Sequence, residues 1–187
     1  LWWATAAPGA AHESAARGWL VHASPVARMI GASVLLTTPR DGGVAEAELR
    51  KLLGSGTDYR LHLLGQAQLW RLRLGANDLG REELSRWQSR IDALPAALQG
   101  GPYYVLGQAR LRVREHDRAA SALLRLPLVH DADHFLAARA CLEAADALSA
   151  TGQAEHARAL YREVTERFGT TPYAPEAAAA LERRAGS

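Results

Sequence analysis

Apolar residues recur along this chain at the spacing of amphipathic helices, and no segment shows the alternation of apolar and polar positions that is typical of strands. The clearest stripe has members three or four residues apart and consists of Leu84, Trp87, Ile91 and Leu94. Helices are predicted over residues 10–23, 25–36, 44–53, 58–74, 82–98, 103–114, 117–126, 135–150, 154–168 and 172–184. The pattern therefore predicts an all-α protein of about nine or ten helices.

Short breaks separate these stretches and consist of residues that disfavour helix. Pro, Gly and polar residues form them at 8–9, 24–25, 39–43, 54–56, 100–102, 151–153 and 169–171. Pro95 is expected to kink or end the helix in which it lies, and Pro127 to stop another. Asp117 is expected to be an N-cap, and Asp131 or Asp133 is expected to cap the helix that follows it.

At five points a small residue follows an aliphatic or small one. These steps are Ile30-Gly31, Leu64-Gly65, Leu106-Gly107, Ala144-Ala145 and Ala178-Ala179, and their second members are 34, 42, 38 and 34 residues apart. A period near 34 residues is typical of helix-turn-helix repeats, in which small residues let two helices cross near backbone contact. Each step is predicted to mark a buried helix crossing. The alternative is an irregular helical bundle whose alanine-rich sequence produces the spacing by accident.

Small residues recur at matching offsets in the C-terminal half. Residues 138–169 contain the small Ala145, Gly152 at a turn, and Ala157 four residues before Tyr161. The preceding unit has its small-residue step and an Ala-x-x-x-Leu step at matching offsets, Leu106-Gly107 and Ala119 to Leu123. The chain thus resembles bacterial tetratricopeptide repeat proteins, although no unit has the family's tryptophan and two spacings imply insertions.

This resemblance implies a right-handed solenoid of antiparallel helical hairpins. Degenerate hairpins are expected over residues 1–99, and repeats with a C-terminal capping helix over 100–187. In that family the first helix of each hairpin lines a concave groove. The corresponding positions here, a candidate partner-binding groove, are Tyr59, His62, Gln66, Trp70, Tyr104, Gln108, Arg112, Arg139, Leu142 and Asp146. Trp70 and Tyr104 have a second interpretation as packing between hairpins, and Arg112 as the partner of a nearby glutamate.

Composition adds limits to this picture. The 22 basic and 20 acidic residues give a net charge of +2 without any block of like charge, so no strong field attracts nucleic acid or membrane. Cys141 has no second cysteine to pair with and is predicted to be a small buried hydrophobe. No segment has the roughly 18 uninterrupted apolar residues of a membrane span. The start at Leu1 lacks an initiator Met and a basic flank, and is expected to be the edge of a longer chain, either a truncated helix or the tail of a lost anchor.

Catalytic and metal-binding patterns are weak. The cluster from His130 to His134 has metal-capable side chains at alternating positions, but a solvated connection that caps the next helix is the favoured interpretation. No serine lies in a G-x-S-x-G context, and Gly54-Ser55-Gly56 lacks the Lys-Ser or Lys-Thr of a phosphate loop. We therefore expect no enzymatic activity, cofactor or metal.

The sequence favours a non-catalytic interaction scaffold that binds a peptide or protein partner within a larger bacterial assembly. The alternative is a membrane-tethered cell-envelope or complex-assembly factor whose anchor preceded residue 1. A helical-repeat RNA binder is disfavoured, because the arginines are spread along the chain and offset by nearby acids. The bacterial cytoplasm and the periplasm or cell envelope both stay open as the compartment.

Overall fold

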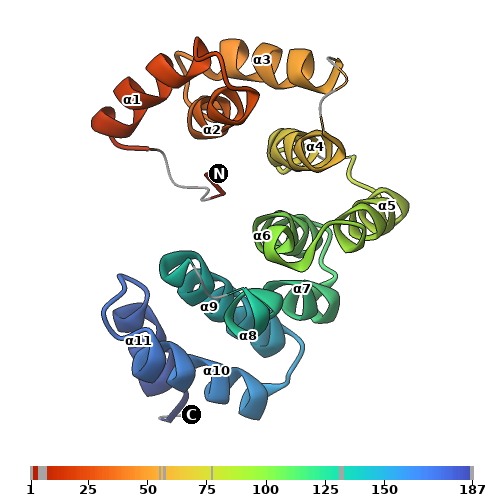
Figure 1. Ribbon diagram of the computed structural model, residues 1–187. Coiled ribbons are helices and arrows are strands. Elements are labelled where there is room, and N and C mark those ends of the chain that lie inside the picture. The colour runs from red at the N-terminus through yellow and green to blue at the C-terminus, as the bar shows by residue number, and fades with distance from the viewer. Residues whose placement is uncertain are drawn as a thin grey trace. The chain divides into compact units, whose positions relative to one another are not determined.

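The computed structural model describes residues 2–3, 8–54, 56, 58–76, 78–130 and 133–185, with only the backbone described for residues 184 and 185. This part of the chain is all-helical (Figure 1). The predicted all-α class is confirmed. The helices are α1 (Ala10–Leu20), α2 (Pro25–Leu35), α3 (Gly42–Gly54), α4 (Tyr59–Arg73), α5 (Arg81–Asp92), α6 (Ala96–Arg112), α7 (His116–Leu123), α8 (Arg125–Val129), α9 (His134–Ala150), α10 (Ala154–Arg167) and α11 (Ala174–Ala185). None of them, over the described residues, is long and apolar enough to cross a membrane.

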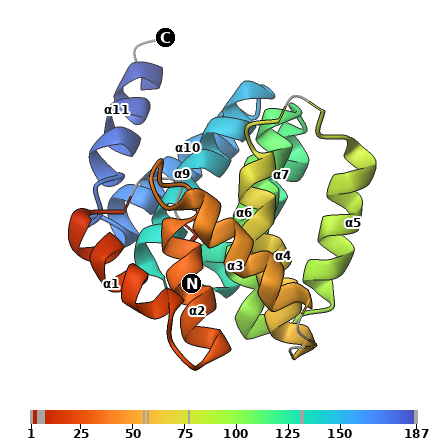
Figure 2. The same cartoon turned by 90° about the horizontal axis from the view of Figure 1, so that it is seen from above.

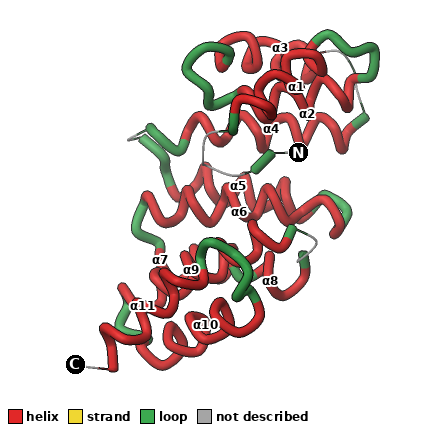
Figure 3. Tube along the Cα trace, turned by 90° about the vertical axis from the view of Figure 1, so that its left-hand side faces the viewer, coloured by secondary structure: helices red, strands yellow, loops and turns green. Residues whose placement is uncertain are grey.

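The chain divides into two compact units. Unit 1 comprises Leu1–Asp78 and Ser89–Val105, and unit 2 comprises Leu79–Gln88 and Leu106–Ser187, so that α5 and α6 each contribute to both. In unit 1, α2 packs against α1 and α3, and α3 packs against α4 (Figure 2). In unit 2, α9 packs against α7, α8 and α10, and α10 packs against α11 (Figure 3). Within each unit, helices close in sequence therefore pack against each other.

Local sequence signals explain where several helices begin. Asp58 caps α4 by accepting a hydrogen bond from the Arg60 amide at 2.9 Å. Asp133 caps α9 in the same way, through the Leu136 amide at 3.0 Å, which confirms one of the two predicted caps; Asp131 lies outside the described residues. Gly152 adopts φ +79° in the turn from α9 to α10, a backbone conformation that glycine adopts without steric cost.

The predicted N-cap at Asp117 is wrong. Helix α7 already begins at His116, with Glu115 at the capping position, so that Asp117 lies in the first turn. Arg114 precedes the cap at φ +59°, in the left-handed region that few non-glycine residues adopt. The N-cap at Glu115 therefore lies two residues before the predicted one.

The predicted break at residues 100–102 is also wrong. Helix α5 ends at Asp92, before Pro95, and α6 then runs without interruption through Gly100, Gly101 and Pro102. Gly101 serves close packing instead of a turn, because the indole of Trp3 occupies the space that a Cβ would need. A contact nearly a hundred residues away in sequence thus overrides the local breaker signal.

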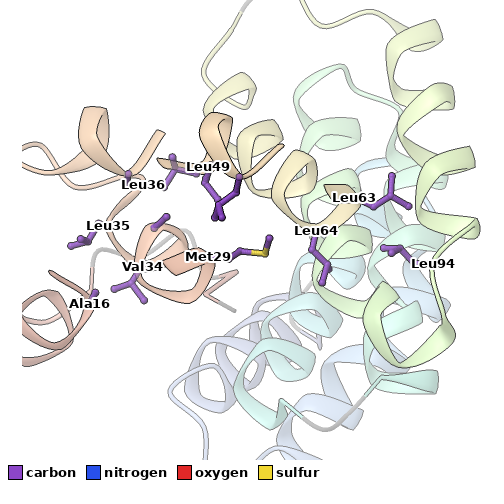
Figure 4. Close-up of a cluster of buried hydrophobic side chains, with 12 residues drawn as sticks. Ala16, Met29, Val34, Leu35, Leu36, Leu49, Leu63, Leu64 and Leu94 are labelled. Atoms are coloured by element: carbon purple, nitrogen blue, oxygen red, sulfur yellow. The ribbon is translucent and has the colours of Figure 1, made fainter. Parts of the chain in front are cut away.

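Aliphatic side chains from α1 to α4 form the core of unit 1. Leu35 from α2 and Leu49 from α3 are fully buried, and Met29 extends toward Leu64 on α4 (Figure 4). Trp2 and Trp3 pack against this cluster while half-buried themselves. Burial of each such leucine stabilises the folded state by about 1.5–3 kcal/mol. These contributions hold the helices of unit 1 against one another.

The small-residue steps mark helix contacts in most of the predicted places. A Cβ at Gly31 would lie 2.6 Å from the backbone oxygen of Ala16, and one at Gly107 would lie 2.6 Å from Leu123 Cγ. Those two crossings are confirmed, and Ala144 and Ala145 are fully buried. The step at residues 178–179 differs from expectation, because both alanines are only half-buried on the last helix of the chain.

We expect Gly107→Leu to lower the free energy of unfolding by about 1–3 kcal/mol through overpacking. The added side chain would collide with Leu123, which is fully buried and has little space to retreat. Urea unfolding followed by circular dichroism measures the change. Gly18→Leu is the matched control, since Gly18 lies in α1 with no atom within 4 Å of a Cβ, and this change should stabilise by about 0.5–1 kcal/mol. Equal stability of Gly107→Leu and wild type would contradict the crossing.

Candidate functional site

The groove residues predicted in unit 1 fall into an accessible set and a buried set. Tyr59 is 59% exposed at the start of α4. One turn on, His62 Nε2 and Gln66 Nε2 lie 2.9 Å apart, and Gln66 Oε1 accepts a hydrogen bond from Arg90 Nη1 at 3.0 Å. These three groove positions form a polar strip along α4.

Trp70 and Tyr104 belong to the buried set. Trp70 is 7% exposed and Tyr104 is 0% exposed, which favours the packing interpretation over contact with a partner. Leu142 in unit 2 is likewise buried, at 4% exposed. Large aromatic side chains in helical proteins most often fill space between helices, as these do.

Three groove residues of unit 2 come together around one pocket. Leu111 near the end of α6, His116 at the start of α7, and Glu143, Asp146 and Ala147 on α9 line an open pocket of about 170 Å³, which we call the α9 pocket. Asp146 was predicted as a groove residue, and Gln108 and Arg139 both contact Glu143 at its edge. Arg112 is exposed at the end of α6 and does not line the pocket.

Glu143 is the link between α6 and α9. Its Oε1 accepts a hydrogen bond from Arg139 Nε at 2.9 Å, one turn earlier on the same helix. Its Oε2 accepts from Gln108 Nε2 on α6. The carboxylate is half-buried and held by donors on both sides, so the side chain has a fixed orientation beside the pocket. Sequence reasoning missed this residue, although its i,i+4 spacing from Arg139 was a usable signal.

Asp146 is the exposed carboxylate of the pocket. Tyr161 on α10 donates its hydroxyl to Asp146 Oδ1 at 2.6 Å, and the Tyr161 side chain is itself fully buried. A buried donor thus holds the aspartate while the residue stays exposed to solvent. Sequence reasoning identified Tyr161 only as part of the repeat pattern, because its contact with Asp146 joins two helices whose relative rotation the sequence does not determine.

His116 adds a polar atom that lacks a partner. Its Nδ1 is buried and makes no hydrogen bond to any described residue, although the ring lines the pocket. A buried polar atom left unsatisfied costs about 1–3 kcal/mol. The imidazole nitrogen donates or accepts according to its tautomer, so a bound group of either kind satisfies it.

The charges around the α9 pocket favour a partner with hydrogen-bond donors. Glu143 and Asp146 each carry a negative charge, and Arg139 compensates one of them through its ion pair. The remaining carboxylate accepts backbone amides, ammonium or guanidinium groups. Leu111 and Ala147 supply apolar surface beside it. The lining thus combines charged, polar and apolar side chains.

Two other sequence candidates have packing roles. Cys141 is fully buried, as predicted, and burial raises the pKa of its thiol to about 12, so it stays protonated and unreactive at neutral pH. In the His130–His134 stretch, the His134 ring packs against Phe168 with centroids 4.8 Å apart. Burial and the nearby Arg125 charge lower the pKa of His130. Among the residues that the structure describes, no three ligand-type side chains gather as they would around a metal ion.

Comparison with known proteins finds no relative: no family model, no curated protein and no solved structure matches this chain.

Proposed function

We propose that this chain is a non-catalytic interaction scaffold of tetratricopeptide-like helical hairpins, and that it binds a peptide segment of a partner protein at the α9 pocket. One observation carries the proposal. Asp146 is fixed by the buried hydroxyl of Tyr161 yet exposed, and it shares a pocket with a His116 nitrogen that has no partner among the described residues. A site with an oriented acceptor and an unsatisfied polar atom is prepared for a polar ligand.

The helix contacts of unit 2 support the hairpin part of the proposal. Gly107 on α6 lies directly against Leu123 on α7, the Ala145 side chain on α9 is fully buried, and Gly152 makes the turn into α10. These are the positions at which a tetratricopeptide unit needs small residues or a left-handed turn. The handedness of the stacking and the repeat status of residues 1–99 stay predictions.

The size of the pocket favours one side chain of a peptide. A volume of about 170 Å³ is smaller than the roughly 300–1,000 Å³ typical of sites for small-molecule ligands. Leu111 and Ala147 contact an aliphatic stem, and Asp146 accepts from a polar group at its end. A lysine or arginine side chain has both parts, and the backbone amides beside it supply further donors.

Peptide selection on the purified chain tests this proposal. Displayed random peptides are selected on wild type, and the affinity of each selected peptide is then measured for Asp146→Asn. This change removes the charge but keeps an oxygen acceptor for Tyr161, so we expect about tenfold weaker binding with unchanged thermal unfolding.

Glu155→Gln on α10 is the matched control, because that glutamate is exposed and lies outside the pocket lining. Its affinity should equal that of wild type. Selection of no peptide, or equal affinity of Asp146→Asn and wild type for all selected peptides, would overturn the assignment of the pocket.

A further inference from the structure

Three buried polar side chains gather in unit 1, whereas the α9 pocket belongs to unit 2. Ser33 on α2 and Gln68 on α4 are 0% exposed, and Arg71 on α4 is 5% exposed. Arg71 Nη1 donates to the Ser33 backbone oxygen and to Gln68 Oε1, both at 2.7 Å, so the three residues form one network. Buried polar networks are costly to assemble, and a network of this kind inside an aliphatic core calls for an explanation.

This network holds the backbone of Trp2. The Trp2 amide donates to Ser33 Oγ at 2.9 Å, and the Trp2 carbonyl accepts from Arg71 Nη1 at 3.1 Å. Ser33 Oγ in turn donates to the Ile30 carbonyl at 2.8 Å. This hydrogen bond orients the lone pairs of Ser33 Oγ toward the Trp2 amide. Side chains of two helices thus bind both backbone polar groups of a residue that belongs to no helix. Peptide-binding proteins hold extended ligands by the same kind of backbone hydrogen bond.

A second feature accommodates the next side chain. The Trp3 indole lies against Gly101 on α6, so closely that a Cβ at this position would overlap the ring. The Trp2 ring lies 5.6 Å from the His12 ring, in a tilted arrangement. Both tryptophans are half-buried against the unit 1 core. The site therefore combines a backbone clamp with places for two adjacent aromatic rings.

The fit of this segment is incomplete. Trp2 Nε1 and Gln68 Nε2 are buried donors without an acceptor among the described residues. Each such donor gives up the hydrogen bond that it makes with water in the unfolded chain, which disfavours this arrangement. Burial also lowers the pKa of Arg71 to about 10, which reflects the cost of removing its charge from water. A ligand that places a phenylalanine at the first ring position, or an acceptor beside Gln68, avoids part of this cost.

We propose that Ser33, Gln68, Arg71 and Gly101, together the unit 1 cradle, form a binding site for an extended peptide with two adjacent aromatic residues, which Trp2-Trp3 occupies as an intramolecular ligand. A partner segment of the same chemistry binds by displacing the chain's own segment. Because the segment is covalently attached, its effective concentration is high and the cradle is closed to weak competitors. This inference is independent of the α9 pocket and stands or falls separately from it.

The test uses a fluorescently labelled peptide with the sequence of residues 1–8 and the double variant Trp2→Ala, Trp3→Ala of the 187-residue chain. Fluorescence anisotropy should show saturable binding to the double variant and at least about tenfold weaker binding to wild type, in which the attached segment competes. Adding Gly101→Leu to the double variant should abolish binding, because the leucine fills the place of the Trp3 ring. Adding Gly18→Leu instead should leave binding unchanged, since Gly18 has open space around it.

A folded double variant that binds no peptide overturns the proposal. If the double variant loses its helical circular dichroism, the test moves to a chain with a protease site inserted between Pro8 and Gly9, cut after folding. The cut chain should release its segment on dialysis, stay helical and take up the labelled peptide. A cut chain that stays helical without binding, or one that unfolds when its segment leaves, overturns the proposal, because the segment is then an ordinary core element.

Discussion

Gly31→Leu is expected to lower the free energy of unfolding by about 3 kcal/mol, the upper end of the range for overpacking. The obstruction is backbone: a Cβ would lie 2.6 Å from the Ala16 oxygen and 3.2 Å from the Leu20 nitrogen. No change of side-chain rotamer relieves these contacts, so α1 has to move away from α2 as a body. Urea unfolding measures the free energy, and hydrogen exchange of the α1 amides shows whether the loss begins there.

Graded replacements test the cause of this loss. A Cβ at Gly107 meets the branched end of the Leu123 side chain, and the nearest atom to a Cβ at Gly65 is Leu53 Cδ2 at 3.1 Å. Replacement by leucine should therefore lower the free energy of unfolding most at Gly31, less at Gly107 and least at Gly65. Side-chain ends yield more easily than a helix backbone, which sets this order. A loss at Gly31 smaller than that at Gly65 would show that α1 and α2 do not cross at backbone contact.

The sequence was sufficient for the helices and for the crossings that small residues permit. Periodicity located most helices within a few residues, and Gly31 and Gly107 lie where two helices touch. It failed at Gly101, because the residue that requires a glycine there is Trp3, far away in sequence. Gly and Pro lower the local propensity of the chain to form a helix. In the structure, the packing of Trp3 against a continuous helix outweighs that local effect.

Only part of the candidate site could be predicted from the sequence. The repeat frame placed Gln108, Arg139 and Asp146 on one side of unit 2, and all three lie at or beside the α9 pocket. The roles of Glu143 and Tyr161 were not predicted. Hydrogen bonds between helices depend on how each helix is rotated about its axis, and hydrophobic periodicity does not determine that rotation. For Trp70 the sequence left partner contact and packing both open, because a position in a repeat frame does not separate an exposed ring from a buried one; its burial favours packing.

Phe168→Ala is expected to lower the free energy of unfolding by about 3–5 kcal/mol, the range for removing a fully buried aromatic ring. Phe168 caps the end of α10 and is 0% exposed, and its ring packs against His134 at the start of α9. Its carbonyl accepts from the amide and the hydroxyl of Thr171, at 2.9 and 2.7 Å, in the turn that leads into α11. The ring therefore anchors the point at which three helices of unit 2 are joined.

Phe135→Ala is the matched control for this prediction, because Phe135 lies on the same stretch of α9 but is 60% exposed. Its replacement should change the free energy of unfolding by less than about 0.5 kcal/mol. Urea unfolding compares the two variants, and hydrogen exchange should show faster opening of α11 in Phe168→Ala alone. Equal costs would contradict the burial of Phe168. A large cost with unchanged exchange in α11 would show that α11 is held by its contacts with α10 and not by the turn at Thr171.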